Sequence, residues 1–162
     1  MPERKATESF MLRDLKRLLF GTSVPDIEHP VFGRLYWCPG RRGPFWMHDA
    51  DTDDDLAISI TTTQTEPPSQ AQVSFYQGVI ASLDAAFQEV APLLIDRYEK
   101  GLRRPFPAQW RTAFKFAGMG VPVDGKRTSP WDIAFTLLTD DLGHIFTCYY
   151  ENGVPTTVSV DT

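Results

Sequence analysis

The chain has 162 residues and a formal net charge of −5 at pH 7, with 42% hydrophobic and 12% aromatic residues. A chain of this length and apolar content suits one independently folding domain over residues 1–162, and it argues against intrinsic disorder. The negative charge disfavours nucleic acid as a partner, because phosphate binding needs clustered Lys and Arg side chains.

The first 21 residues predict an amphipathic helix that begins after Ser9 and stops at Gly21. Its apolar residues recur at helical spacing: Met11, Leu12, Leu15, Leu18 and Leu19. Charged residues interrupt the apolar ones, so the segment resembles neither a secretory signal nor a membrane span. We therefore expect a cytoplasmic protein without membrane association. The helix is expected to dock on the domain, although its basic face also fits a membrane surface.

Residues 30–62 predict a first antiparallel β-meander, with strands at 30–37, 45–48 and 56–62. The turn between the first two strands carries Arg41 and Arg42. Five aspartates occupy the seven positions 49–55 between the last two strands. An EF-hand is excluded, because both possible registers put the wrong residues at the glycine and glutamate positions. A solvated acidic turn, a weak surface cation site and a contact for a basic partner remain open.

These two turns and the aromatic strand between them predict one contact surface with both charge signs and large rings. We expect its partner-binding residues to be Asp51, Asp53, Asp54, Asp55, Trp46, Arg41 and Arg42.

Residues 69–103 predict a long helical segment that starts with a Ser69–Gln72 capping box. Pro92 removes a backbone donor in the middle, so we expect a kink near Pro92 or a second helix that starts beside it. Residues 105–130 carry mixed signals. Residues 110–116 fit either a helix or a strand, and the Gly and Pro content of residues 118–130 predicts loops.

The pattern of residues 131–161 predicts a closing β-meander of three strands. Apolar and smaller or polar residues alternate from Trp131 to Leu138, which is typical of a strand with one buried face. Asn152-Gly153 is typical of a hairpin turn.

Few residues suggest catalysis. There is no nucleophile elbow, no phosphate-binding loop and no zinc-ligand spacing, so we expect no cofactor and no metal. Cys38 and Cys148 are expected to be unpaired thiols. His144 with Asp140 or Asp141 across a turn is the one candidate acid/base site, against the alternative of a hydrogen-bonded structural histidine. The enzyme alternative uses His144 and Asp141.

Several short motifs resemble families of small bacterial proteins encoded beside polymorphic toxins, as immunity or accessory proteins. The motifs are residues 29–35 (HPVFGRL), Trp46, the helical residues 70–98, residues 144–146 (HIF) and the later Asn152-Gly153. The resemblance implies neutralisation of a partner, and a basic toxin domain would suit the acidic run.

Together these patterns predict an α+β fold, in which two antiparallel β-meanders form one twisted sheet packed by the N-terminal helix and the long kinked helix. The leading functional hypothesis is a non-enzymatic, immunity-like protein-binding module that acts by occlusion and charge complementarity. The alternative is a small enzyme or ligand-binding protein with a pocket near His144. Monomer and homodimer are both compatible with the sequence.

Overall fold

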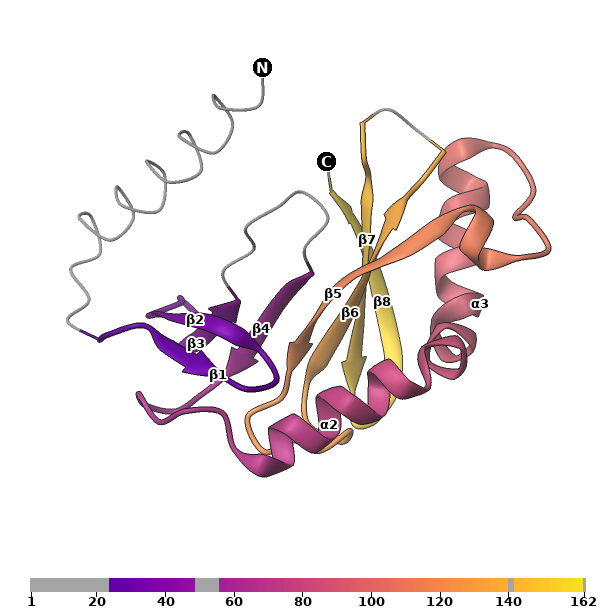
Figure 1. Ribbon diagram of the computed structural model, residues 1–162. Coiled ribbons are helices and arrows are strands. Elements are labelled where there is room, and N and C mark those ends of the chain that lie inside the picture. Colours follow the sequence, from indigo (N-terminus) through magenta and orange to yellow (C-terminus); the bar gives the residue numbers. More distant parts are fainter. Residues whose placement is uncertain (1–23, 49–55, 140–141, 162) are drawn as a thin grey trace, which may run out of the picture.

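The computed structural model describes residues 24–48, 56–139 and 142–161. The expected helix over residues 1–21 lies outside the described residues. The described part is an α+β fold with one eight-stranded sheet and two long helices on one of its faces (Figure 1).

The strands lie in the sheet in the order in which they occur in the chain. They are β1 (Ile27–His29), β2 (Gly33–Cys38), β3 (Phe45–His48), β4 (Ala57–Thr61), β5 (Phe114–Val121), β6 (Trp131–Leu137), β7 (Ile145–Glu151) and β8 (Val154–Asp161). The first meander therefore has four strands, because residues 30–32 form a turn between β1 and β2.

The sheet is mixed, which corrects the expectation of a wholly antiparallel arrangement. Strands β4 and β5 pair in parallel, with Ala57 opposite Gly118, while every other described pair is antiparallel. Parallel neighbours need a long crossover connection, and the segment with both helices supplies it. The two meanders are joined through this single parallel pair.

The prediction of loops over residues 118–122 is wrong, because most of this stretch belongs to β5. The glycines that suggested a loop instead allow close approach of the backbones. A Cβ atom built on Gly118 would lie 2.1 Å from the Ala57 carbonyl oxygen. The ambiguous stretch before it is a short 3₁₀ turn, Trp110–Thr112, followed by the start of β5.

The helices are α2 (Gln70–Ala81) and α3 (Leu83–Leu102), and they bend by 78° relative to each other. The expected break near Pro92 is misplaced: the break is at Ser82, whose hydroxyl donates to the Gly78 carbonyl at 2.7 Å. Pro92 lies within α3 on its exposed side, where water can solvate the carbonyl that loses its partner. The Ser69–Gln72 capping box is confirmed at the start of α2.

The core lies between the helices and the sheet. The alternation predicted for β6 is confirmed: Trp131, Ile133, Phe135 and Leu137 are buried and the residues between them are half-buried. Phe87 of α3 stacks on Trp110 and meets Phe135 edge-on, with ring centroids 4.4 and 5.3 Å apart. These contacts fix α3 over the second half of the sheet.

Candidate functional site

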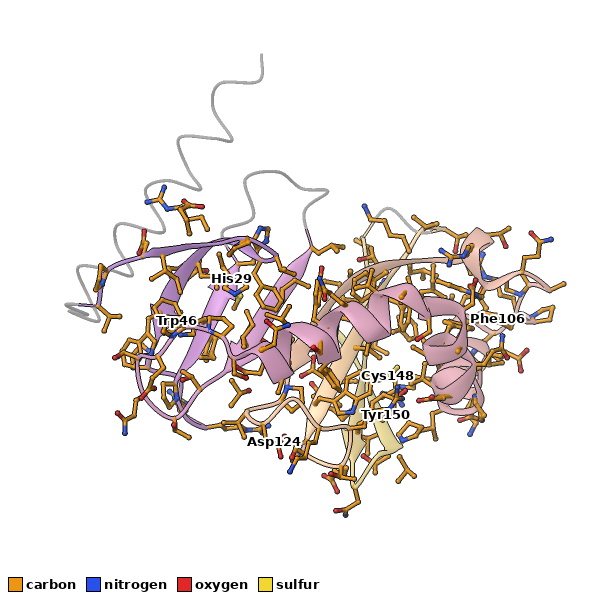
Figure 2. The ribbon with its side chains drawn as sticks, turned by 60° about the horizontal axis from the view of Figure 1, so that its bottom comes forward. His29, Trp46, Phe106, Asp124, Cys148 and Tyr150 are labelled. Carbon is orange, nitrogen blue, oxygen red and sulfur yellow. The ribbon has the colours of Figure 1, made fainter. Side chains whose placement is uncertain are left out.

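Trp46 was expected at a contact surface, and this expectation is wrong. Its side chain is only 1% exposed, and its indole N–H donates to the Glu66 carbonyl oxygen at 2.8 Å. Trp46 pairs with Ile60 across β3 and β4, so both side chains point to the helix-covered face of the sheet. The ring is part of the core, and Figure 2 labels it among the side chains of the first strands.

Arg41 and Arg42 are exposed in the turn between β2 and β3. The acidic run 49–55, with Asp51, Asp53, Asp54 and Asp55, lies outside the described residues. It leaves β3 at the opposite end from that turn, because β3 separates the two connections. The predicted single surface of arginines, aromatic rings and aspartates is therefore not assembled by the described residues.

The charges of the chain are distributed unevenly. The described residues contain eleven Lys and Arg and eleven Asp and Glu, so they carry no net formal charge. The acidic excess comes from the other residues, mainly 49–55 and 140–141. The described residues that flank these two segments lie at the same end of the sheet, where β4 begins and β6 ends. Most of the excess negative charge therefore belongs to two segments that connect to the same end of the sheet.

His144 lies at a pocket, as the alternative hypothesis expected. The pocket has a volume of about 320 Å³ and lies between the C-terminal part of α3 and strands β6 to β8. We call it the α3–β7 pocket. It is lined by Arg97, Lys100, Gly101, Leu102, Leu137, His144, Phe146 and Val160. Asp141, the expected partner of His144, lies outside the described residues.

Two cations stand at this pocket on successive turns of α3. Lys100 is held by Asp96, with the ammonium nitrogen 2.8 Å from a carboxylate oxygen. The Arg97 guanidinium has no hydrogen-bond or ion-pair partner among the residues that the structure describes, and it is exposed. Arg97 is therefore the better candidate to bind an incoming anion.

The helix end beside the pocket adds further positive charge. Arg103 caps α3 in a left-handed conformation, with φ of 53°. Arg104 lies over the Tyr98 ring, 5.5 Å from its centroid, and donates to the Thr139 hydroxyl. The C-terminus of a helix carries roughly half a negative charge, which opposes anion binding. Over residues 96–104 four Lys and Arg side chains outnumber the two carboxylates of Asp96 and Glu99, and this excess of full positive charge favours an acidic group.

The α3–β7 pocket combines an apolar floor with a cationic rim. Its floor is apolar, through Leu102, Leu137, Phe146 and Val160, and its described rim carries cations and an imidazole but no carboxylate. A ligand with an apolar body and an acidic group would match both parts. The sequence pointed to His144, whereas nothing in the sequence singled out Arg97, because its position at the pocket depends on the packing of α3 against β7 and β8.

A polar cluster that sequence reasoning missed lies over the other half of α3. Glu89 accepts hydrogen bonds from Arg127 and from the Tyr150 hydroxyl, the latter at 3.0 Å. Burial and the Glu89 carboxylate raise the pKa of Tyr150. Arg127 also lies over the Trp131 ring, which stacks on Tyr150 with centroids 3.9 Å apart. Its members come from distant parts of the chain and tie the residue 122–130 connection to α3 and β7.

The open face of the sheet carries one perturbed carboxylate. Asp132 points away from the helices, and burial raises its pKa although the Gly120 backbone hydrogen bond partly offsets this. A Cβ atom on Gly120 would lie 2.6 Å from an Asp132 carboxylate oxygen, so glycine makes room for it. Cys148 lies in the neighbouring strand β7, and its pKa is raised to about 12 by burial and by the Asp132 carboxylate. Such a thiol is a poor nucleophile at neutral pH.

Within the described ranges, no group of three or more His, Cys, Asp or Glu side chains is placed to hold a metal ion. Within the same residues no single helix is long and apolar enough to cross a bilayer, and α2 with α3 reaches that length only as a sharply bent pair. Comparison with known protein families, curated proteins and solved structures gives no significant match.

Proposed function

We propose that this protein is a non-enzymatic binding protein of the immunity-like kind. In this proposal the α3–β7 pocket receives an acidic, apolar side chain or chain end from a protein partner. The observation that carries the proposal is the position of the Arg97 guanidinium, without a described partner, beside an apolar hollow of about 320 Å³. The apolar floor would supply affinity and the guanidinium would orient the carboxylate.

The size of the hollow supports a protein partner more than a large cofactor. Its volume is close to the lower limit of the roughly 300–1,000 Å³ range of small-molecule pockets. Protein interfaces are commonly anchored by one or two side chains that enter such hollows, with a charged rim that selects the partner. Binding there would cover the end of α3 and act by occlusion.

The alternative is a small-molecule site or a small enzyme in the same pocket, with His144 as acid or base. This reading is favoured by the location of His144 at the pocket. Catalysis would further need a carboxylate beside the imidazole, and the candidate is Asp141. The acidic run, as a contact for a basic partner, is a separate prediction about another part of the chain.

A titration with paired probes tests the pocket directly. We would follow backbone amide chemical shifts while adding 4-phenylbutyrate or its neutral amide, 4-phenylbutanamide. The acid is expected to bind more tightly than the amide, with shifts at the end of α3 and in β7. The variant Arg97→Gln should remove this preference, while Lys126→Gln, the same change of charge on an exposed residue at the other end of β6, should retain it.

A variant that fills the hollow tests the contribution of the apolar floor separately from that of the Arg97 charge. Gly101 lines the pocket and has open space around the position of a Cβ atom, so Gly101→Trp would fill the hollow from the helix side. Gly78→Trp is the matched control, because Gly78 is also helical, exposed and unobstructed. Equal binding of acid and amide, or shifts away from the pocket, would contradict the proposal. Turnover of the probe would favour the enzyme alternative.

A further inference from the structure

A second cavity lies between α2 and the first half of the sheet. It has a volume of about 260 Å³ and is lined by Val31, Phe32, Gly33, His48, Leu56, Ile58 and Tyr76. We call it the α2–β3 cavity. Most of its lining is apolar or aromatic, and its polar atoms come from His48, Tyr76 and the backbone. It belongs to the first meander, whereas the α3–β7 pocket belongs to the closing one.

The hydrogen bonding of His48 fixes which ring nitrogen can meet a ligand. Its Nδ1 lies 3.1 Å from the Leu56 carbonyl oxygen, and a carbonyl only accepts, so Nδ1 carries the proton. In the neutral ring Nε2 is then an acceptor. A Cβ atom on Gly33 would lie 3.5 Å from Nε2, which places this nitrogen at the cavity-lining glycine. Nε2 has no hydrogen-bond partner among residues 24–48, 56–139 and 142–161.

One wall of the cavity is aromatic and well supported. The Phe32 ring lies 5.0 Å from the Tyr76 ring and 5.0 Å from the His29 ring, centroid to centroid. His29 Nδ1 accepts hydrogen bonds from the backbone N–H groups of Val31 and Phe32, at 3.2 and 3.4 Å. These bonds hold the β1–β2 turn, and Gly33 completes it with φ of +68°. The wall is therefore built before any ligand arrives.

We infer that the α2–β3 cavity binds a small phenol or aromatic alcohol, whose ring lies against Phe32 and Tyr76 and whose hydroxyl donates to His48 Nε2. A volume of about 260 Å³ suits a single substituted ring. The apolar lining disfavours a charged ligand, since burial of a charge costs free energy without a paired partner. At His48 an acceptor-only ligand would place its lone pairs against that of Nε2, so this position prefers a donor whatever the Tyr76 hydroxyl does. The site thus selects a neutral ring with one donor.

The matched probes are p-cresol and 4-methylanisole, which differ by methylation of the hydroxyl group. We would titrate both into the natural protein and follow the backbone amides and the ¹⁵N shifts of the imidazole nitrogens. The expected result is that p-cresol binds about threefold to tenfold more tightly, as one net hydrogen bond allows. The His48 Nε2 resonance should shift with p-cresol and not with 4-methylanisole.

The variant His48→Asn gives a second test. The asparagine amide can still donate to the Leu56 carbonyl, as Nδ1 does, but the Nε2 acceptor is lost. The preference for p-cresol should therefore disappear while weak binding of both probes persists. Equal affinities in the natural protein, shifts that cluster outside the cavity, or a preference retained by the variant would each overturn the inference. If the variant does not fold, the comparison of p-cresol with 4-methylanisole on the natural protein still tests the inference.

Discussion

Replacement of Trp46 distinguishes a core residue from a surface contact. The ring is 1% exposed and its N–H group is bound to the Glu66 carbonyl oxygen at 2.8 Å. Truncation to alanine removes a large buried side chain and leaves a cavity, so Trp46→Ala should lower the free energy of unfolding by about 3–5 kcal/mol. Trp46→Phe keeps most of the apolar contact but loses the hydrogen bond, and about 1–3 kcal/mol is expected.

These losses are large against the roughly 5–15 kcal/mol that holds an ordinary domain together. They would be measured by urea denaturation followed by circular dichroism, with linear extrapolation to water. Arg42→Ala is the control, because an exposed turn residue should change stability by no more than about 0.5 kcal/mol. A loss below about 1 kcal/mol for Trp46→Ala would refute the assignment of this ring to the core.

Three further predictions concern the junction of the sheet and the helices. Gln72 is 5% exposed, and its side-chain amide donates to two backbone carbonyls at 2.7 and 3.0 Å. Gln72→Ala should therefore lower the free energy of unfolding, measured by urea denaturation, by about 2–4 kcal/mol. A decrease of only about 1 kcal/mol, as for loss of a simple helix cap, would contradict this prediction. Gly78→Ala should stabilise the protein by about 0.5–1 kcal/mol, because the added Cβ atom lies in open space within a helix. Gly118→Ala should destabilise the protein or prevent folding, because the added Cβ atom would collide with the backbone of Ala57. The same sign in both would be inconsistent with the β4–β5 pairing. Cys148 should react with a thiol reagent at pH 8 only after the protein unfolds, because burial and the Asp132 carboxylate raise the pKa of its thiol to about 12. Fast labelling of the native protein would contradict the burial of this side chain.

The raised pKa of the Cys148 thiol also sets the sign of a pH effect. The folded state favours the neutral thiol, so its contribution to stability is complete below the unfolded pKa of about 9 and is lost as pH rises toward about 12. Urea midpoints measured from pH 8 to pH 10.5 should therefore fall more steeply for the natural protein than for Cys148→Ala. Parallel curves for the two proteins would show that the thiol does not contribute.

Local sequence patterns predicted the parts of the fold that depend on neighbouring residues. The alternation in β6 and the Ser69–Gln72 capping box are local signals, and the structure contains both. The β7–β8 hairpin also turns at Asn152-Gly153, where both residues have positive φ. Each of these features is set by side chains within a few positions of one another.

The parts that were mispredicted depend on contacts between distant residues. The parallel pairing of β4 with β5 joins residues separated by the whole helical segment, so no local pattern announces it. The same pairing explains why a Gly-rich stretch is a strand. The helix break at Ser82 depends on a hydroxyl that bonds back to Gly78, which competes with Pro92 as the more obvious breaker.

In the candidate site, too, local features could be predicted and contacts between distant residues could not. His144 was found from its residue type, since histidines are few in the chain. The position of Arg97 at the α3–β7 pocket depends on the packing of α3 beside β7 and β8, and the face to which Trp46 points depends on its register with Ile60. Residue type can suggest a site, but the tertiary contacts decide which side chains share it.

The most direct test of the central claim is capture of the natural partner by three tagged variants beside the natural protein. The variants are Gly101→Trp, its control Gly78→Trp, and a protein with Asp51, Asp53, Asp54 and Asp55 all changed to Asn. If the α3–β7 pocket holds the partner, a stoichiometric partner from lysate of the source cells should be lost with Gly101→Trp and retained by Gly78→Trp. Loss with the four-fold Asn variant as well would add the acidic run to the contact. Retention by Gly101→Trp would contradict a role for the α3–β7 pocket in partner binding.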